Sequence, residues 1–225
     1  GSILGTQAIF QFLSKKVKKK IYFFNDINTE QINNFKKDEK FNKTLFIVIS
    51  KSGNTTETLS NFFSLKLDNS NFRKNIIIIS ERNNNPLYFI AKKLKFFHVE
   101  HKKFIGGRYS VLSEVGIIPA FLMGIDIKKL RKNLTRHLDK KNKAFFKQSS
   151  IILAELLSKG KIKNVVFLNY HPKLNQFLFW CQQLIAESLG KKKKGFFPVI
   201  SNVPKDHHSL LQLYLDGPKD KIFYI

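Results

Sequence analysis

The chain has 225 residues, of which 43% are hydrophobic and 25% are charged, so its composition is that of a globular protein and excludes a disordered one. This length allows one or two domains with a sizeable core, and no apolar run is long enough to cross a bilayer. The 40 Lys and Arg residues outnumber the 16 Asp and Glu residues, which gives a net charge of +24.

The positive charge has two interpretations. It is typical of proteins that bind nucleic acid, but the excess is lysine and comes with abundant Asn, Ile and Phe. An A/T-rich genome encodes that mixture without selection for a partner, and no nucleic-acid recognition motif accompanies the charge. We therefore expect neither a nucleic-acid partner nor a membrane. An anionic small substrate would also gain from the positive field.

The cysteine content and the first residues bear on the compartment. The single cysteine, Cys181, cannot form an internal disulfide, which fits a reducing environment. The opening GSILG has neither the basic region nor the cleavage site of a signal peptide. We expect a cytoplasmic protein.

The first half of the chain alternates between helix and strand patterns. Residues 5–17 keep the helical spacing of apolar side chains, and residues 27–43 are polar enough for a loop or a short helix. Short apolar runs predict strands over residues 21–24, 45–49, 76–79 and 94–99. Helices are predicted over residues 55–67 and 86–93. Asn54 with Glu57 three residues later is an N-cap signal for the first of these.

The second half repeats the alternation after a mostly helical stretch over residues 109–160. Its predicted elements are a strand over 164–168, a helix over 172–189 and a strand over 196–200. Strands that are apolar on both faces and alternate with helices indicate an α/β fold with a parallel sheet flanked by helices. We expect a first α/β domain over residues 1–125, a helical connector over 126–160 and the start of a second α/β domain over 161–225.

The stretch SKSGNTTET, residues 50–58, follows a predicted strand and opens a predicted helix. Ligands of open α/β sheets bind at the carboxyl ends of the strands, and helix N-termini offer unpaired N–H groups to anions. Gly53 lets the backbone approach a ligand closely. These features predict a phosphate site, whereas an ordinary N-capped turn would explain only one or two of the hydroxyls. The spacing of a Walker P-loop is absent. The anion donors would be Ser50, Lys51, Ser52 and Thr55.

The glycine-rich stretch FIGGRYS, residues 104–110, displays a second candidate, Arg108. Arginine carries a fixed charge that can stabilise an anion. Pairing of Arg108 with a structural carboxylate is an equally open interpretation.

Two later segments carry candidate acid–base groups. Glu187 lies in the last turn of the predicted helix over residues 172–189, off its apolar stripe, where a negative charge is mildly unfavourable. His207 and His208 stand just before another predicted helix and point in different directions, so we do not expect them to share a metal. One of the two could transfer protons near neutral pH. A surface glutamate and structural histidines are the plain alternatives.

Taken together, these motifs resemble the glucose-6-phosphate isomerase family, whose members contain two sugar-isomerase (SIS) domains of the flavodoxin-like, doubly wound type. GSILG and SKSGNTTET resemble the two phosphate loops of the family, and GGRYS is similar to a stretch specific to it. AESLGK and DHHSLLQL resemble the segments that carry the catalytic glutamate and the ring-opening histidine. The resemblance covers essentially the whole chain, in the order of the family.

The resemblance implies an aldose–ketose isomerase that interconverts glucose 6-phosphate and fructose 6-phosphate through a cis-enediol(ate), without a metal or an organic cofactor. Glu187 would move the proton between C2 and C1, His208 would assist ring opening, and Arg108 would stabilise the charge of the intermediate. A homodimer is implied, in which His208 serves the site of the neighbouring subunit. The implied phosphate ligands are Ser2, Ser50, Lys51, Ser52 and Thr55.

The chain departs from the family at both ends. It starts inside the first phosphate loop, so the first SIS domain would lack its first strand, and it stops before the family's C-terminal helices with the catalytic lysine and glutamine. We therefore expect a fragment of a longer enzyme, poorly stable and nearly inactive on its own. Two alternatives stay open, a sugar-phosphate-binding SIS module without catalysis and a bifunctional glucose/mannose-6-phosphate isomerase.

Overall fold

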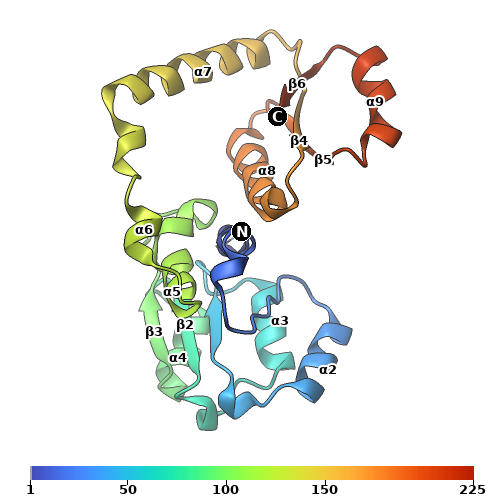
Figure 1. Ribbon diagram of the computed structural model, residues 1–225. Coiled ribbons are helices and arrows are strands. Elements are labelled where there is room, and N and C mark those ends of the chain that lie inside the picture. The colour runs from blue at the N-terminus through green and yellow to red at the C-terminus, as the bar shows by residue number, and fades with distance from the viewer. Residues whose placement is uncertain (1) are drawn as a thin grey trace. The chain divides into compact units, whose positions relative to one another are not determined.

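The computed structural model describes residues 2–225 (Figure 1). Gly1, the first residue of the predicted first domain, lies outside the described residues. Contacts divide the chain into two compact units. The first unit comprises residues 1–7 and 17–123, and the second comprises residues 8–16 and 124–225. Each unit is built around one three-stranded parallel sheet. The predicted domain limits stay predictions.

The sheet of the first unit has the strand order β1-β2-β3. Its strands are β1 (Phe46–Ile49), β2 (Ile76–Ser80) and β3 (Phe97–Glu100). Its α-helices are α1 (Ser2–Phe12), which continues into the second unit, α2 (Thr29–Asp38), α3 (Thr56–Ser64), α4 (Pro86–Leu94) and α5 (Glu114–Leu122). Its 3₁₀-helices are η2 (Phe41–Lys43), η3 (Ser70–Phe72) and η4 (Gly107–Leu112). Helix α3 contacts β1, and α4 contacts β2 and β3, so helices flank the sheet (Figure 1).

Apolar side chains of strands and helices fill the core of the first unit. The sheet register pairs Val48 with Ile78 near its centre, and Ile78 and Leu87 are completely buried. Each such side chain stabilises the folded state by roughly 1.5–3 kcal/mol relative to an exposed one. The core holds the carboxyl ends of the strands in place. Its members are Ile32, Phe35, Phe46, Val48, Phe62, Leu65, Leu67, Ile76, Ile78, Leu87, Ala91 and Phe96.

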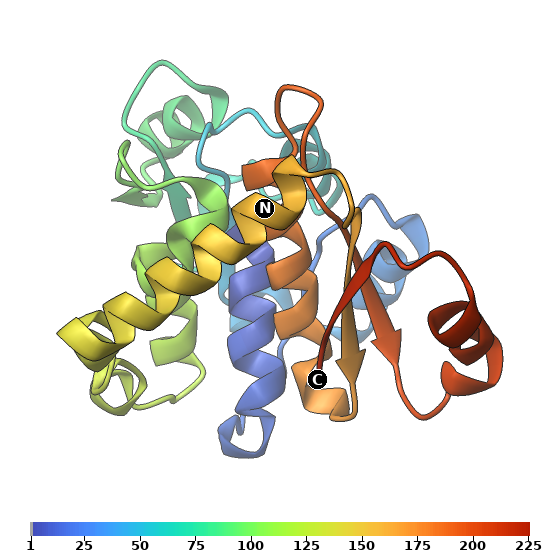
Figure 2. The ribbon, with the colours of Figure 1, turned by 90° about the horizontal axis from the view of Figure 1, so that it is seen from above.

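The second unit contains a parallel sheet with the order β5-β4-β6. Its strands are β4 (Asn164–Asn169), β5 (Phe197–Asn202) and β6 (Lys221–Tyr224). Its α-helices are α6 (Ile127–Arg131), α7 (Lys140–Ser158), α8 (Asn175–Leu189) and α9 (His207–Asp216). Its 3₁₀-helices are η1 (Ser14–Lys16), η5 (Thr135–Leu138) and η6 (Pro172–Leu174). Helix α8 packs on β5, and Figure 2 shows β4 and β5 side by side with α9 on a loop beyond them.

The structure confirms the predicted α/β class with parallel sheets flanked by helices. The strands predicted over residues 45–49, 76–79, 164–168 and 196–200 correspond closely to β1, β2, β4 and β5. Strand β3 begins at Phe97 because Leu94 still belongs to α4, and Lys95, with a left-handed φ of 56°, ends that helix. Strand β6 was not predicted. Among residues 2–225, no helix combines the length and the apolar character that a membrane crossing needs.

One strand prediction was wrong. Residues 21–24 lie outside every strand of the described structure. The rings of Tyr22 and Phe24 pack edge-on against Phe35 of α2, with centroid distances of 5.0 and 5.3 Å. The Gln31 side-chain amide donates to the Phe23 carbonyl at 3.0 Å. Helix α2, and not a neighbouring strand, therefore covers the rings of this apolar run and supplies a hydrogen-bond donor to its main chain.

Candidate functional site

The hydroxyl-rich turn lies where it was predicted, at the carboxyl end of a parallel strand. Ser50 directly follows β1, and its N–H donates to the Ile79 carbonyl of β2 at 3.1 Å. Helix α3 begins at Thr56, so residues 50–55 form the turn between strand and helix. This edge of an open α/β sheet, next to a helix N-terminus, is a favourable place for an anion.

A hydrogen bond between two hydroxyl side chains joins the two ends of this turn. The Ser50 and Thr55 side-chain oxygens lie 2.7 Å apart, and the Gly53 N–H donates to the Ser50 hydroxyl oxygen at 3.1 Å. The predicted N-cap, Asn54, is wrong, because Thr55 occupies that position. In the described part of the chain no side chain caps α3, since the Thr55 hydroxyl is turned to Ser50. The first N–H groups of α3 are therefore left for water or an anion.

Gly53 is required by the shape of the turn. Its φ is +68°, a backbone conformation that residues other than glycine rarely adopt. A Cβ at this position would lie 1.7 Å from the Asn85 Oδ1 atom. The buried Asn85 caps α4 by accepting from the Tyr88 N–H at 2.9 Å. The Gly53 carbonyl in turn accepts from the Leu87 N–H at 3.2 Å. The first residues of α4 thus pack against the turn and hydrogen-bond to it.

Lys51 contacts two other segments at the same edge of the sheet. Its ammonium donates to the Lys103 carbonyl at 3.0 Å and lies 3.5 Å from the Glu81 carboxylate. The neighbouring Ser52 is exposed. Of the predicted phosphate ligands in the turn, Ser50 and Thr55 therefore pair with each other, and Lys51 reaches the segment after β3.

The GGRYS segment forms the start of η4. A Cβ on Gly107 would lie 3.2 Å from the Ser2 hydroxyl oxygen, so the first residue of α1 lies directly against this glycine. The Arg108 guanidinium stacks over the Tyr109 ring at 4.7 Å from its centroid, a cation–π contact. The structure thus places Ser2 beside the segment that carries Arg108.

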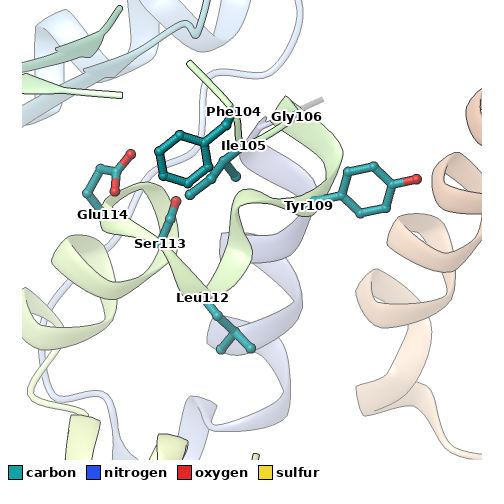
Figure 3. A pocket seen from close by; sticks show the side chains of 7 residues that line it. All are labelled: Phe104, Ile105, Gly106, Tyr109, Leu112, Ser113 and Glu114. Atoms are coloured by element: carbon teal, nitrogen blue, oxygen red, sulfur yellow. The ribbon is translucent and has the colours of Figure 1, made fainter. Parts of the chain in front are cut away.

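A pocket of about 570 Å³ opens beside this segment (Figure 3). Phe104 and Ile105 lie beside Ser113 and Glu114 in Figure 3, whereas the Tyr109 ring points away from them. The Glu114 carboxylate accepts from the Lys102 N–H at 3.2 Å. The pocket is lined by Phe104, Ile105, Gly106, Tyr109, Leu112, Ser113 and Glu114.

The two predicted acid–base residues belong to the second unit, on different helices. Glu187 is exposed in the last turn of α8, where its carboxylate accepts from the Gln183 side-chain amide at 3.2 Å. His208 is exposed in the first turn of α9, which begins at His207 and so includes both histidines. The His207 ring packs edge-on against Tyr170, with centroids 6.0 Å apart. Among residues 2–225, no group of three or more His, Cys, Asp and Glu side chains is arranged to hold a metal ion.

Sequence reasoning missed two residues that shape the turn. Asn85 precedes Pro86, and an asparagine before a proline at a helix start is a readable N-cap signal. Its contact with Gly53, however, is tertiary, because the two residues are 32 positions apart in the chain. No sequence pattern pointed to Glu81, because its partner Lys51 follows a different strand, β1, whereas Glu81 follows β2.

The fold and these segments define an α/β protein whose first parallel sheet carries a hydroxyl-lined turn and an arginine-bearing loop at its carboxyl edge. A family model described as phosphoglucose isomerase matches residues 1–199. The chain belongs to the phosphoglucose isomerase family.

Individual relatives agree with this assignment. The chain is 36% identical over 230 residues to a glucose-6-phosphate isomerase of Methanocaldococcus jannaschii, covering 99% of this chain and 56% of the relative. It is 38% identical over 237 residues to a probable glucose-6-phosphate isomerase of Methanococcus maripaludis, covering 99% and 53%. The crystal structure of a hypothetical protein from Thermus thermophilus matches with a TM-score of 0.84 and 27% identity, covering 99% of this chain and 56% of that one. The chain spans about half the length of the curated relatives it matches.

Proposed function

We propose that the protein interconverts glucose 6-phosphate and fructose 6-phosphate. The observation that carries this proposal is the hydroxyl-lined turn at the carboxyl end of β1, which shares its sheet edge with the Arg108 segment. The names of the relatives support the same reaction and substrate. No observation favours a binding module without catalysis or a second sugar specificity.

The phosphate of the substrate binds at the turn after β1. The N–H groups at the start of α3 and the nearby hydroxyls donate hydrogen bonds to its oxygens, and the lysine adds positive charge. Helix α1 contributes from beside Gly107. The proposed ligands are Ser2, Ser50, Lys51, Ser52 and Thr55.

The sugar end of the substrate reacts by proton transfer. His208 assists opening of the ring, which exposes the C1 aldehyde of glucose 6-phosphate. The Glu187 carboxylate then takes the proton from C2 and returns it to C1. In the same conversion the C2 hydroxyl loses its proton and becomes the ketone of fructose 6-phosphate, while the C1 aldehyde oxygen gains a proton and becomes a hydroxyl. Arg108 stabilises the negative charge of the cis-enediolate between these two steps, since a fixed cation is most effective where charge develops.

The assembly belongs to the proposal as well. We propose a homodimer in which His208 completes the site of the neighbouring subunit, two SIS domains starting with residues 1–125 and 161–225, and a connector over residues 126–160. A cytoplasmic location is consistent with Cys181 as the single cysteine of the chain.

The base assignment is tested with Glu187→Gln in the full-length gene product. The amide keeps the shape of the side chain but cannot accept the C2 proton, so kcat should fall by at least about 1,000-fold while 6-phosphogluconate still binds. Glu155→Gln, on the exposed surface of α7, is the matched control and should keep full activity. Turnover of Glu187→Gln near that of the control would refute the assignment.

The shared site is tested by mixing two inactive variants, Glu187→Gln and His208→Gln. If His208 serves the neighbouring subunit, each mixed dimer has one site with both defects and one intact site. Random exchange of subunits should then restore activity at about one quarter of all sites. If each subunit completes its own site, mixing restores nothing, and that result would exclude the shared arrangement.

A further inference from the structure

One lysine connects all three strand ends of the first sheet. Lys51 lies in the turn after β1, Glu81 directly follows β2, and Lys103 lies in the segment after β3. The Lys51 ammonium donates to the Lys103 carbonyl at 3.0 Å and lies 3.5 Å from the Glu81 carboxylate. We call this arrangement the Lys51 bridge. It spans the carboxyl edge of the sheet, where the proposed substrate binds.

The bridge is partly buried and is supported by the main chain. The Lys51 and Glu81 side chains are only 30% and 16% exposed. The Glu81 N–H also donates to the Lys51 carbonyl at 2.9 Å, so the backbones of the two residues are held together as well. A fully exposed ion pair contributes little, but a half-buried ammonium with a carboxylate and a carbonyl partner is restricted to one geometry.

Lys103 directly precedes the segment that carries Arg108. Phe104, Ile105 and Gly106 follow it and line the pocket of Figure 3. The far end of this segment is fixed by the Ser110 hydroxyl, which donates to the Gly107 carbonyl at 2.6 Å. The bridge therefore holds the near end of a segment whose far end is already secured.

We propose that Lys51 is a positioning residue for Arg108, holding residues 103–108 in register with the phosphate turn through the Lys103 carbonyl. This inference rests on the proposed function, in which phosphate and enediolate bind at these two segments at once. The distance between the phosphate turn and the guanidinium is then set by the protein before the substrate arrives. Misplacement of a catalytic group by about 1 Å can lower a rate by up to about 100-fold.

Glu81→Gln separates this role from direct phosphate binding, because it keeps the lysine charge and the main-chain contacts of residue 81. At 3.5 Å the contact depends mainly on the carboxylate charge, which the amide lacks. We expect a fall in kcat of about tenfold and faster amide exchange over residues 103–108, while inorganic phosphate still binds.

The matched control is Glu100→Gln, which removes the carboxylate of the neighbouring Lys102–Glu100 pair at 3.6 Å and leaves the bridge intact. It should change neither kcat nor the exchange rates. If Lys51 acted only as a phosphate cation, Glu81→Gln would free its charge, tighten phosphate binding and leave kcat and exchange at the values of the control. That outcome would overturn the proposal.

A second pair of variants addresses the lysine itself. Lys51→Met should speed amide exchange over residues 103–108, and Lys51→Arg should keep the protection because a guanidinium can still reach both acceptors. Unchanged exchange in Lys51→Met would refute the bridge. These measurements need no turnover, so a gene product without isomerase activity would reject the proposed function and still decide whether the bridge holds the segment.

Discussion

The hydroxyl oxygens of Ser50 and Thr55 lie 2.7 Å apart across the turn that joins β1 to α3. Ser50 also accepts from the Gly53 N–H at 3.1 Å, so one serine holds both halves of the turn. The shape of the turn is thus set by the protein itself. An anion that binds there does not have to order the loop first, which favours affinity.

Ser50→Ala should weaken the turn and its ligand together. It removes the hydroxyl that pairs with Thr55 and accepts from the Gly53 N–H, although that N–H keeps its bond to the Ser50 carbonyl. We expect the Kd for 6-phosphogluconate to rise about tenfold, equivalent to about 1.4 kcal/mol. Isothermal titration calorimetry measures this change. Thr56→Ala, at an exposed hydroxyl in the first turn of α3, is the control. Equal affinities of the two variants would argue against a role of the Ser50 hydroxyl.

Gly53→Ala should destabilise the protein more than Gly124→Ala. Both glycines have a positive φ, +68° and +85°, so both substitutions strain the backbone by about 1–2 kcal/mol. A Cβ on Gly53 also collides with Asn85, whereas one on Gly124 meets nothing within 4 Å among the described residues. We expect an additional loss of at least about 1 kcal/mol in the free energy of unfolding, measured by urea denaturation.

The collision itself can be isolated by a double-mutant cycle. Asn85→Ala alone removes the cap of α4 and should cost about 1 kcal/mol. In combination with Gly53→Ala, it also removes the side-chain atoms that the new Cβ would meet. The stability loss of the double variant should therefore be smaller than the sum of the losses of the two single variants. Additive losses would show that the contact between Gly53 and Asn85 does not limit the turn.

His98 should make stability dependent on pH in mildly acidic solution. Burial, reinforced by the nearby Arg82 charge, lowers the pKa of His98 below its usual 6.5, and a main-chain hydrogen bond with Ser80 and the Glu100 charge oppose this only in part. Below pH 6.5 the unfolded chain therefore binds more protons at this residue than the folded one. The free energy of unfolding should fall as the pH decreases from about 6.5 through the lower folded-state value.

Substitution tests this assignment. His98→Gln should flatten the acidic branch of the stability curve, and His137→Gln, at an exposed position, should leave it as it is. The titration of the His98 ring can be followed directly by NMR. A folded-state pKa above 6.5 would contradict the burial argument.

The Cys181 thiol should react slowly with alkylating reagents in the folded protein. Burial raises the pKa of Cys181 to about 11, so at pH 7.5 the folded protein holds on the order of 100-fold less thiolate than the unfolded chain. Iodoacetamide labelling of the Cys181 peptide, read by mass spectrometry, should be slower by a similar factor in the folded state. The rate should still rise with pH beyond 9, and a plateau near pH 9 would contradict the prediction.

Much of the fold could be predicted from local patterns. The runs LFIVI and IIII are apolar on both faces, as is typical of strands in a parallel sheet covered by helices, and they form β1 and β2. The run IYFF carries the same local signal but forms no strand, because Phe35 of α2 covers two of its rings. Local pattern identifies an apolar segment, whereas its neighbours decide whether it joins a sheet.

The candidate site divides in the same way. The hydroxyls after β1, the glycines before Arg108, and the acid–base residues Glu187 and His208 could all be named from residue type and spacing. The partners of Lys51 could not, because Glu81 and Lys103 follow two other strands. Nor could the contact of Ser2 with Gly107, since these residues lie at opposite ends of the first unit's sequence.

The sequence by itself determined the alternation of most strands and helices, the family, and the residue types that the proposed chemistry requires. These depend on hydrophobic periodicity and on motifs within a few residues, which the chain carries locally. Only the tertiary structure decided that Lys51 joins the ends of three strands, that Asn85 supports Gly53 and that residues 21–24 stay out of the sheet. Parallel strands bring together segments that are distant along the chain, and only their packing sets which side chains meet there.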